Sequence, residues 1–123
     1  MEKILVVDDE EFIRTLIKEV LDPQGHTVIT ASSGKAAFQL CHERSFDLLI
    51  TDLEMPDMDG IELISSLRGV QKELPILAIS GAFSGRFLRT ANTLGAVGSL
   101  DKPFRVAELL AMVDKILGKQ ADK

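Results

Sequence analysis

The sequence has no tryptophan and no tyrosine, so its aromatic content rests on six phenylalanines. Its single cysteine, Cys41, excludes an internal disulfide, and the sequence has no Cys/His cluster with zinc-ligand spacing. These absences predict a reducing, cytoplasmic setting. The apolar run Ile4–Val7 is too short for a signal-peptide core or a membrane span, and acidic residues follow it at once. We therefore expect neither export nor a membrane partner.

Positive charge is also scarce: 14 Lys and Arg stand against 19 Asp and Glu, a formal charge of −5. The basic residues are scattered singly, whereas neutralising the phosphates of a nucleic acid or an anionic membrane takes clustered ones. We therefore expect no direct nucleic-acid partner. The 123 residues have the length of one domain, which buries enough surface to fold without a disulfide or a structural zinc.

Short apolar runs rich in β-branched residues recur along the chain. They predict five strands, over Lys3–Val7, Thr27–Ala31, Asp47–Thr51, Ile76–Ser80 and Ala96–Leu100. Apolar residues between Phe12 and Leu21, and again between Val106 and Leu117, repeat at helical spacing and predict amphipathic helices. The lengths of the remaining gaps, with Ser33 and Ser84 as candidate caps, predict helices over Ser33–Glu43, Gly60–Arg68 and Ser84–Leu94.

Strands that alternate with single helices predict right-handed crossovers and one doubly wound parallel sheet, an α/β fold with both faces covered. The helix over Ser84–Leu94 should shift most easily, because Gly85, Asn92 and Thr93 are poor helix formers. We expect one domain over residues 1–118 and a polar tail over 119–123 that frays.

Polar side chains stand where the predicted strands end. The five positions are Asp8 and Asp9, Asp52, Ser80 and Lys102. Ligands of such sheets bind beyond the carboxyl ends of the strands, so these side chains are expected to converge. A single Asp after a strand is usually a turn or cap residue, but three close together repel one another and require a raised pKa or a cation. The sequence therefore predicts a site for a hard divalent cation.

Magnesium suits this site because it prefers oxygen ligands and typically uses one or two carboxylates together with phosphate oxygens. Phosphoryl chemistry follows from the same residues. A carboxylate can attack phosphorus and form an acyl phosphate when a metal and a cation absorb the developing charge. Lys102 would supply the cation, and Ser80 a further contact to the phosphoryl group.

The acidic loop before Gly60 has a second interpretation, as a calcium loop. Aligning Gly60 with the invariant glycine of an EF-hand puts Met55 and Ser66 where an Asp and a bidentate Glu are needed. The calcium interpretation fails on this count. Asp57 and Asp59 are instead expected to serve the loop turn and the start of the next helix, outside the site.

Over residues 2–118 the chain resembles the response-regulator receiver domains of two-component signalling. The resemblance rests on Ile4–Val7 running into Asp8-Asp9, the stretch Leu48–Gly60 around Asp52, Ser80-Gly81, and Lys102-Pro103-Phe104. It implies a flavodoxin-like fold of five strands and five helices, (βα)5, with strand order 2-1-3-4-5.

By this resemblance Asp52 is the phospho-acceptor. Asp8 and Asp9 would hold Mg²⁺, or Mn²⁺ in its place, together with Asp52 and the backbone carbonyl of Glu54. The side chains of Glu54 and Ala82 would flank the attacking water and tune the lifetime of the phosphate.

The resemblance also assigns roles to the last two strand ends. Ser80 would move toward the phosphoryl group and Lys102 would bond it, with a cis peptide between Lys102 and Pro103. The space that Ser80 leaves would let the helix over Ser84–Leu94 shift to a new position. The chain would thus be a signalling switch that assists its own phosphorylation and dephosphorylation, not an enzyme acting on a separate substrate.

The absence of tyrosine matters at one position, because the family usually has an aromatic residue three before the lysine. Here that residue is Ser99, which cannot fill a ring-sized pocket. Either Phe83 or Phe87 takes over, or the output passes through the Ser80 loop and the helix after it.

The implied partners are a sensor histidine kinase or phosphotransfer protein as donor, and a downstream protein or an attached output domain as target. The chain is either a stand-alone receiver or the receiver of a longer regulator. Enzymes on the same fold fit poorly. A haloacid-dehalogenase-like phosphatase needs a second Asp two residues after its nucleophile, and a flavin protein needs a hydroxyl-rich phosphate loop after the first strand; Asp8-Asp9-Glu10 provides neither.

Overall fold

The computed structural model covers residues 2–56, 58–81 and 85–121. Its centre is one parallel sheet of five strands in the order β2-β1-β3-β4-β5, which confirms the predicted doubly wound α/β fold. The strands are β1 (Lys3–Val7), β2 (Thr27–Ala31), β3 (Leu48–Asp52), β4 (Ile76–Ser80) and β5 (Gly98–Asp101).

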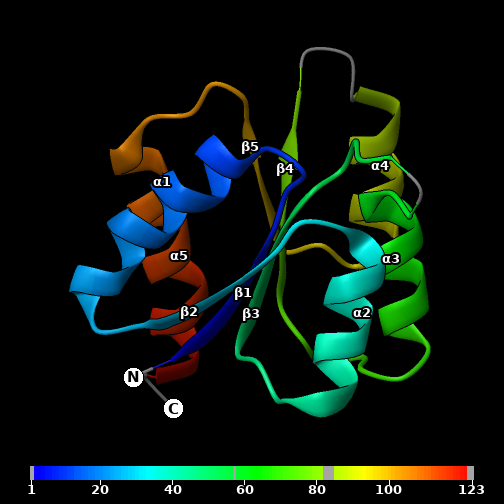
Figure 1. The fold of residues 1–123 in the computed structure, drawn as a ribbon, viewed down its shortest axis with the longest axis horizontal. Helices are drawn as coiled ribbons and strands as arrows, with labels where there is room; N and C mark the ends of the chain where they lie inside the picture. The colour runs from blue at the N-terminus through cyan, green and yellow to red at the C-terminus, as the bar shows by residue number, and fades with distance from the viewer. Residues whose placement is uncertain (1, 57, 82–84, 122–123) are drawn as a thin grey trace.

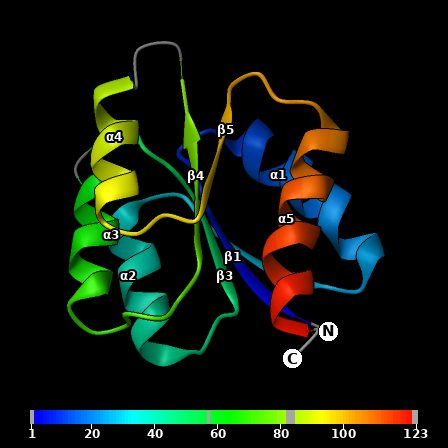
Figure 2. The same ribbon diagram turned by 180° about the vertical axis from the view of Figure 1, so that it is seen from behind.

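Helices cover both faces of the sheet (Figure 1). They are α1 (Glu11–Leu21), a short 3₁₀ helix η1 (Asp22–Gln24), α2 (Gly34–Glu43), α3 (Gly60–Arg68), α4 (Gly85–Thr93) and α5 (Val106–Ala121). Helices α1 and α5 lie on one face and α2, α3 and α4 on the other, an arrangement that Figure 2 shows from behind. None of the helices in the described ranges combines the length and the apolar character needed to cross a bilayer.

Two apolar clusters, one on each face, hold these layers together. Along β1 the side chains alternate: Ile4 and Val6 join the cluster under α1 and α5, while Leu5 and Val7 join the cluster under α2, α3 and α4. Strands β3 and β4 are buried along their whole length. This double burial explains why the strands read as unbroken apolar runs in the sequence.

The predicted boundaries of β1, β2, β4 and α3 are confirmed to the residue, and the other elements differ slightly at their ends. Asp52 belongs to β3, because its backbone still pairs with Ile79 of β4. Strand β5 starts at Gly98, later than predicted. Helix α5 continues to Ala121, so residues 119–121, expected as part of a frayed tail, belong to the helix instead.

The predicted caps are present where the structure describes them. Ser33 Oγ accepts the Ala36 N–H at 3.1 Å, and Asp59 caps α3 in a capping box with Glu62. Asp59 is therefore the N-cap of α3, which confirms the role at the helix start that the sequence predicts. The predictions for Asp57, Ala82, Phe83 and Ser84, and for the Phe87 side chain, lie outside the described residues.

Arg68, at the end of α3, ties together the loops at the amino end of the sheet. Its guanidinium donates to backbone carbonyl oxygens on two segments. The acceptors are Gln71 at 3.1 Å, Lys72 at 3.2 Å, Leu74 at 2.9 Å, Leu94 at 2.9 Å and Gly95 at 3.2 Å. The segment before β4 and the segment after α4 are therefore held by one side chain.

Candidate functional site

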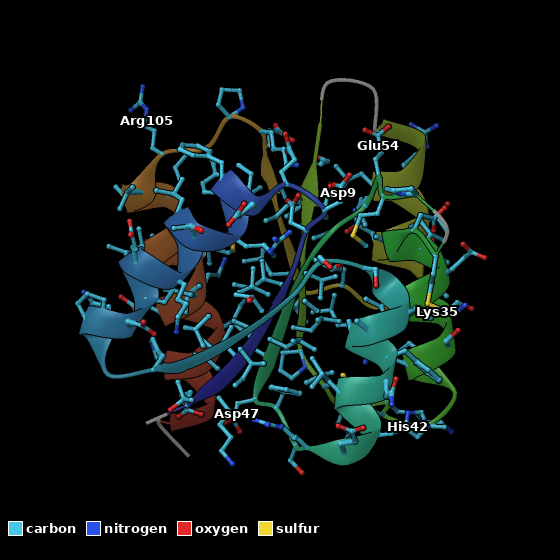
Figure 3. All side chains as sticks on the ribbon, in the orientation of Figure 1. Asp9, Lys35, His42, Asp47, Glu54 and Arg105 are labelled. Carbon is cyan, nitrogen blue, oxygen red and sulfur yellow. The ribbon has the colours of Figure 1, made fainter. Side chains whose placement is uncertain are left out.

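The carboxyl ends of the strands meet at one edge of the sheet, opposite the edge that Arg68 closes. Figure 3 shows Asp9 and Glu54 at this edge, where β1 and β3 finish, and Asp47 and His42 at the other. A parallel sheet brings all its carboxyl ends to the same side, so residues distant in sequence become neighbours there.

Asp8 directly follows β1 and is fully buried. Its Oδ1 accepts the Glu10 N–H at 2.8 Å, whereas its Oδ2, shielded from solvent, has no hydrogen-bond partner among the described residues. The Lys102 ammonium lies 3.2 Å from this Oδ2. Burial raises the pKa of Asp8 above its usual value, although the Glu10 N–H and Lys102 oppose the shift.

Asp52 ends β3 and is 3% exposed. Its Oδ1 accepts the Glu54 N–H at 3.3 Å, and its Oδ2 accepts a hydrogen bond from Lys102 Nζ at 3.3 Å. Burial, reinforced by the charge of Asp8, raises the pKa of Asp52 to about 6, while Lys102 pulls it back. A carboxylate of this kind is a poorly solvated anion close to a cation, the environment expected of a functional carboxylate.

The start of α3 packs tightly behind Asp52. Gly60 donates its N–H to the Leu53 carbonyl at 3.2 Å, and a Cβ at Gly60 would overlap the backbone carbonyl oxygen of Asp52. Only glycine fits this close approach without moving the backbone that carries the carboxylate.

Lys102 follows β5, and its side chain is 19% exposed. Besides Asp8 and Asp52, its Nζ contacts Glu10 Oε1 at 2.8 Å. Burial works to lower the pKa of Lys102, but the hydrogen bond to Glu10 and the charges of Asp8 and Asp52 outweigh it, so the pKa is raised. The lysine is therefore a fixed positive charge. The peptide between Lys102 and Pro103 is cis, as the resemblance implied.

Ser80 ends β4 and is 3% exposed. Its hydroxyl donates to Asp101 Oδ1 at 2.9 Å, and the Lys102 N–H donates to its carbonyl at 2.7 Å. Ser99, which stands where the family has an aromatic residue, is half-buried on β5 next to Leu100 and Glu108 in a groove of about 300 Å³.

The acidic group fits a divalent cation. One carboxylate oxygen from each of Asp8, Asp9 and Asp52 can be chosen so that all three lie within 4.8 Å of one another. All-oxygen donors suit Mg²⁺, and the buried Asp8 Oδ2, which has an ion pair with Lys102 but no hydrogen-bond partner among the described residues, has a lone pair to offer a cation. Lys102 alone balances only part of the negative charge of these residues.

The structure brings all the predicted strand-end residues to one edge, with Glu54 exposed beside them. Two residues were missed: Glu10, which contacts Lys102, and Asp101, which contacts Ser80. Both are acidic and adjoin a predicted site residue in sequence, which is the signal that was available. The direction of their side chains was not readable from the sequence.

Two residues outside the site behave as core and surface groups. Cys41 is buried in the cluster under α2, and burial raises the pKa of its thiol to about 11, so it stays protonated. His42 is exposed on α2 and packs edge-on against Phe38.

The sheet order 2-1-3-4-5 with helices on both faces is the flavodoxin-like α/β fold, and the acidic, lysine-containing group lies at its carboxyl edge. Residues 4–114 match the family described as "Response regulator receiver domain", and the chain belongs to this family.

Relatives and solved structures agree with this assignment. Sporulation initiation phosphotransferase F of Bacillus subtilis is 30% identical over 116 residues, which cover 94% of this chain and 94% of that protein. The alkaline phosphatase synthesis transcriptional regulatory protein PhoP of the same species is 39% identical over 115 residues, 94% of this chain. The chain spans only 48% of that regulator. The structure of Vibrio cholerae chemotaxis protein CheY4 matches with a TM-score of 0.88 at 33% identity, covering 94% of this chain and 98% of that one.

Proposed function

We propose that this receiver domain accepts a phosphoryl group on Asp52 and uses it to switch a protein-binding surface. The observation that carries the proposal is the environment of Asp52: a carboxylate 3% exposed, bonded by Lys102 and grouped with Asp8 and Asp9. An acceptor needs an available oxygen, a cation near the transferring group and exclusion of bulk water, and this position offers all three.

In the transfer, one oxygen of the Asp52 carboxylate attacks the phosphorus of a phosphohistidine. A P–O bond forms, the P–N bond breaks, and the imidazole keeps the electron pair and takes up a proton from solvent. With acetyl phosphate as donor, a P–O bond breaks instead and acetate leaves. A pKa of about 6 leaves Asp52 mostly ionised at neutral pH, as the attack requires.

Magnesium would be held by Asp8, Asp9, Asp52 and the backbone carbonyl of Glu54, and Mn²⁺ could take its place. When bound, the ion supplies positive charge for the phosphoryl oxygens. Lys102 remains beside Asp52 as a second cation, so the domain contributes to its own phosphorylation. The side chains of Glu54 and Ala82 would flank the water that later hydrolyses the acyl phosphate and set its lifetime.

The new phosphoryl oxygens would recruit Ser80, whose hydroxyl turns toward Asp52, while Lys102 bonds another oxygen. The phosphate adds charge and acceptor oxygens at the end of the sheet. Helix α4 is the next element after β4 and has poor helix formers, so it would shift and alter the surface beside β5. Ser99 leaves no ring to move in or out, so this chain would pass its signal mainly through the Ser80 loop and α4.

The phosphoryl donor would be a histidine kinase or a phosphotransfer protein, in the cytoplasm, where the free buried Cys41 stays reduced. The target would be a downstream protein or an output domain on the same polypeptide. Relatives of both kinds occur, because sporulation initiation phosphotransferase F is nearly the length of this chain and PhoP is about twice as long. The length of the encoding reading frame separates the two. We propose no direct contact with nucleic acid.

Incubation with acetyl phosphate and Mg²⁺, followed by quantification of bound phosphate, tests the proposal. Asp52→Asn should reduce incorporation by about 100-fold or more, because the amide cannot act as the nucleophile. Asp114→Asn, an exposed change of the same charge on α5, should incorporate phosphate like the wild type. Undiminished incorporation in Asp52→Asn would overturn the assignment.

A further inference from the structure

The Ser80 hydroxyl already has a charged partner before any phosphoryl group is present. Ser80 and Asp101 stand opposite each other at the ends of β4 and β5, and Ser80 Oγ donates to Asp101 Oδ1 at 2.9 Å. Ser80 is 3% exposed, whereas Asp101 is exposed. A hydrogen bond to an ionised carboxylate is stronger than one to a neutral acceptor.

This bond matters because a serine hydroxyl has one proton to donate. Asp101 and a phosphoryl oxygen on Asp52 would compete for that proton. The Lys102 N–H donates to the Ser80 carbonyl at 2.7 Å, which keeps the two strand ends paired while the side chain rotates.

Lys102 also has an acidic partner, but its situation differs. Its Nζ contacts Glu10 at 2.8 Å, Asp8 at 3.2 Å and Asp52 at 3.3 Å at the same time. An ammonium group has three donors, so it can keep Glu10 and Asp8 while it bonds a phosphoryl oxygen in place of the Asp52 carboxylate. Ser80 cannot keep Asp101 in the same way. Of the two acidic neighbours, Asp101 is therefore the one whose contact must break.

We propose that Asp101 is a positioning residue: it holds the Ser80 hydroxyl in the unmodified protein and thereby sets how readily a phosphoryl group on Asp52 recruits Ser80. This inference rests on the proposed function, since it assigns a regulator to the same site. Asp101 stabilises the unswitched arrangement, and its removal shifts the equilibrium toward the switched one.

The test measures the affinity for beryllofluoride, a phosphoryl mimic, with saturating Mg²⁺. The chain has no tryptophan to report binding, so the amide resonances of Ser80 and Gly81 serve as the readout. Asp101→Asn keeps the shape of the side chain and leaves only a neutral acceptor. It should lower the apparent dissociation constant about fivefold, since a charge-assisted bond is replaced by a weaker one.

A double-mutant cycle separates positioning from a general charge effect. In a Ser80→Ala background there is no hydroxyl to hold, so Asp101→Asn should change the affinity by less than about twofold. Asp114→Asn removes the same charge elsewhere on the chain and should leave the wild-type affinity unchanged.

Three results would overturn the inference. An equal effect of Asp101→Asn with and without Ser80 would make Asp101 a charge rather than a positioning residue. Unchanged affinity in Asp101→Asn, with normal binding in the wild type, would remove the positioning role and leave the proposed function standing. A wild type that shows no saturable response would remove the proposed function, and the inference with it.

Discussion

Two cationic side chains lie at opposite ends of the same sheet, and their acceptors differ in charge. Arg68 donates to five backbone carbonyl oxygens, all neutral, on the loops at the amino end. Lys102 contacts the carboxylates of Asp8, Glu10 and Asp52 at the carboxyl end. The charge of Arg68 is thus surrounded by neutral carbonyl dipoles, whereas the charge of Lys102 is surrounded by more negative charges than it can balance.

This difference indicates that the amino end of the sheet, around Arg68, has a structural role and that the carboxyl end, around Lys102, has a functional one. Each of the five carbonyl oxygens around Arg68 accepts a hydrogen bond from it, so these groups need no ligand to satisfy them. Around Lys102 the carboxylates outnumber the cation, and the buried Asp8 Oδ2 has no hydrogen-bond partner among the described residues. The carboxyl end is thus prepared to bind positive charge and, with it, a phosphoryl group.

The largest effect on function is expected from removing the cation at the carboxyl end. Lys102→Ala should retain the fold but lose the Ser80 and Gly81 resonance changes caused by Mg²⁺ and beryllofluoride, because the second cation beside Asp52 is gone. In metal-free protein the unfolding free energy should fall by about 1–2 kcal/mol, and Mg²⁺ should restore it. Unfolding of this variant that Mg²⁺ does not reverse would make Lys102 a structural residue and break the comparison.

Removing the cation at the amino end should have the converse result. Arg68→Met keeps the apolar stem but deprives the loop carbonyls of their donor, so the unfolding free energy should fall by about 2–4 kcal/mol. Denaturant unfolding measures the loss, with the exposed Arg44→Met as control. The Mg²⁺ affinity of the folded variant should match the wild type, and a changed affinity would show that the two ends are coupled.

A smaller effect is expected from pH. The pKa of Asp52 is raised to about 6 in the folded protein, so its protonated form adds stability below about pH 4, and this stability is lost as the pH rises through 6. In metal-free protein at pH 7.5, Asp52→Asn should therefore raise the unfolding free energy by about 1–3 kcal/mol, and the gain should shrink toward pH 4.5. A gain that grows in acid would contradict the assigned environment of Asp52.

The fold was predictable because strands that are buried on both faces appear in the sequence as runs of apolar residues. Apolar runs located β1 and β4 to the residue, and the β-branched residues of the edge strand β2 located that strand equally well. One error falls where a polar residue continues a strand. Asp52 was placed after β3 because a charged residue reads as a strand end, yet its backbone still pairs with β4.

The site was predictable as a set of strand ends, since topology alone brings them together. The contacts of Glu10 and Asp101 were not predictable, because they depend on rotamers at the ends of β1 and β5. Arg68 was missed for a related reason. It reads as an ordinary basic residue at a helix end, and some of its acceptors come from a loop after α4, distant in the sequence.

Locating the modified residue tests the central claim most directly. After phosphorylation by acetyl phosphate with Mg²⁺, borohydride reduction converts an aspartyl phosphate into homoserine, which peptide mass spectrometry assigns to a position. The account predicts homoserine at Asp52 in the wild type and none in Asp52→Asn. Homoserine at Asp8 or Asp9, with Asp52 unchanged, would contradict it.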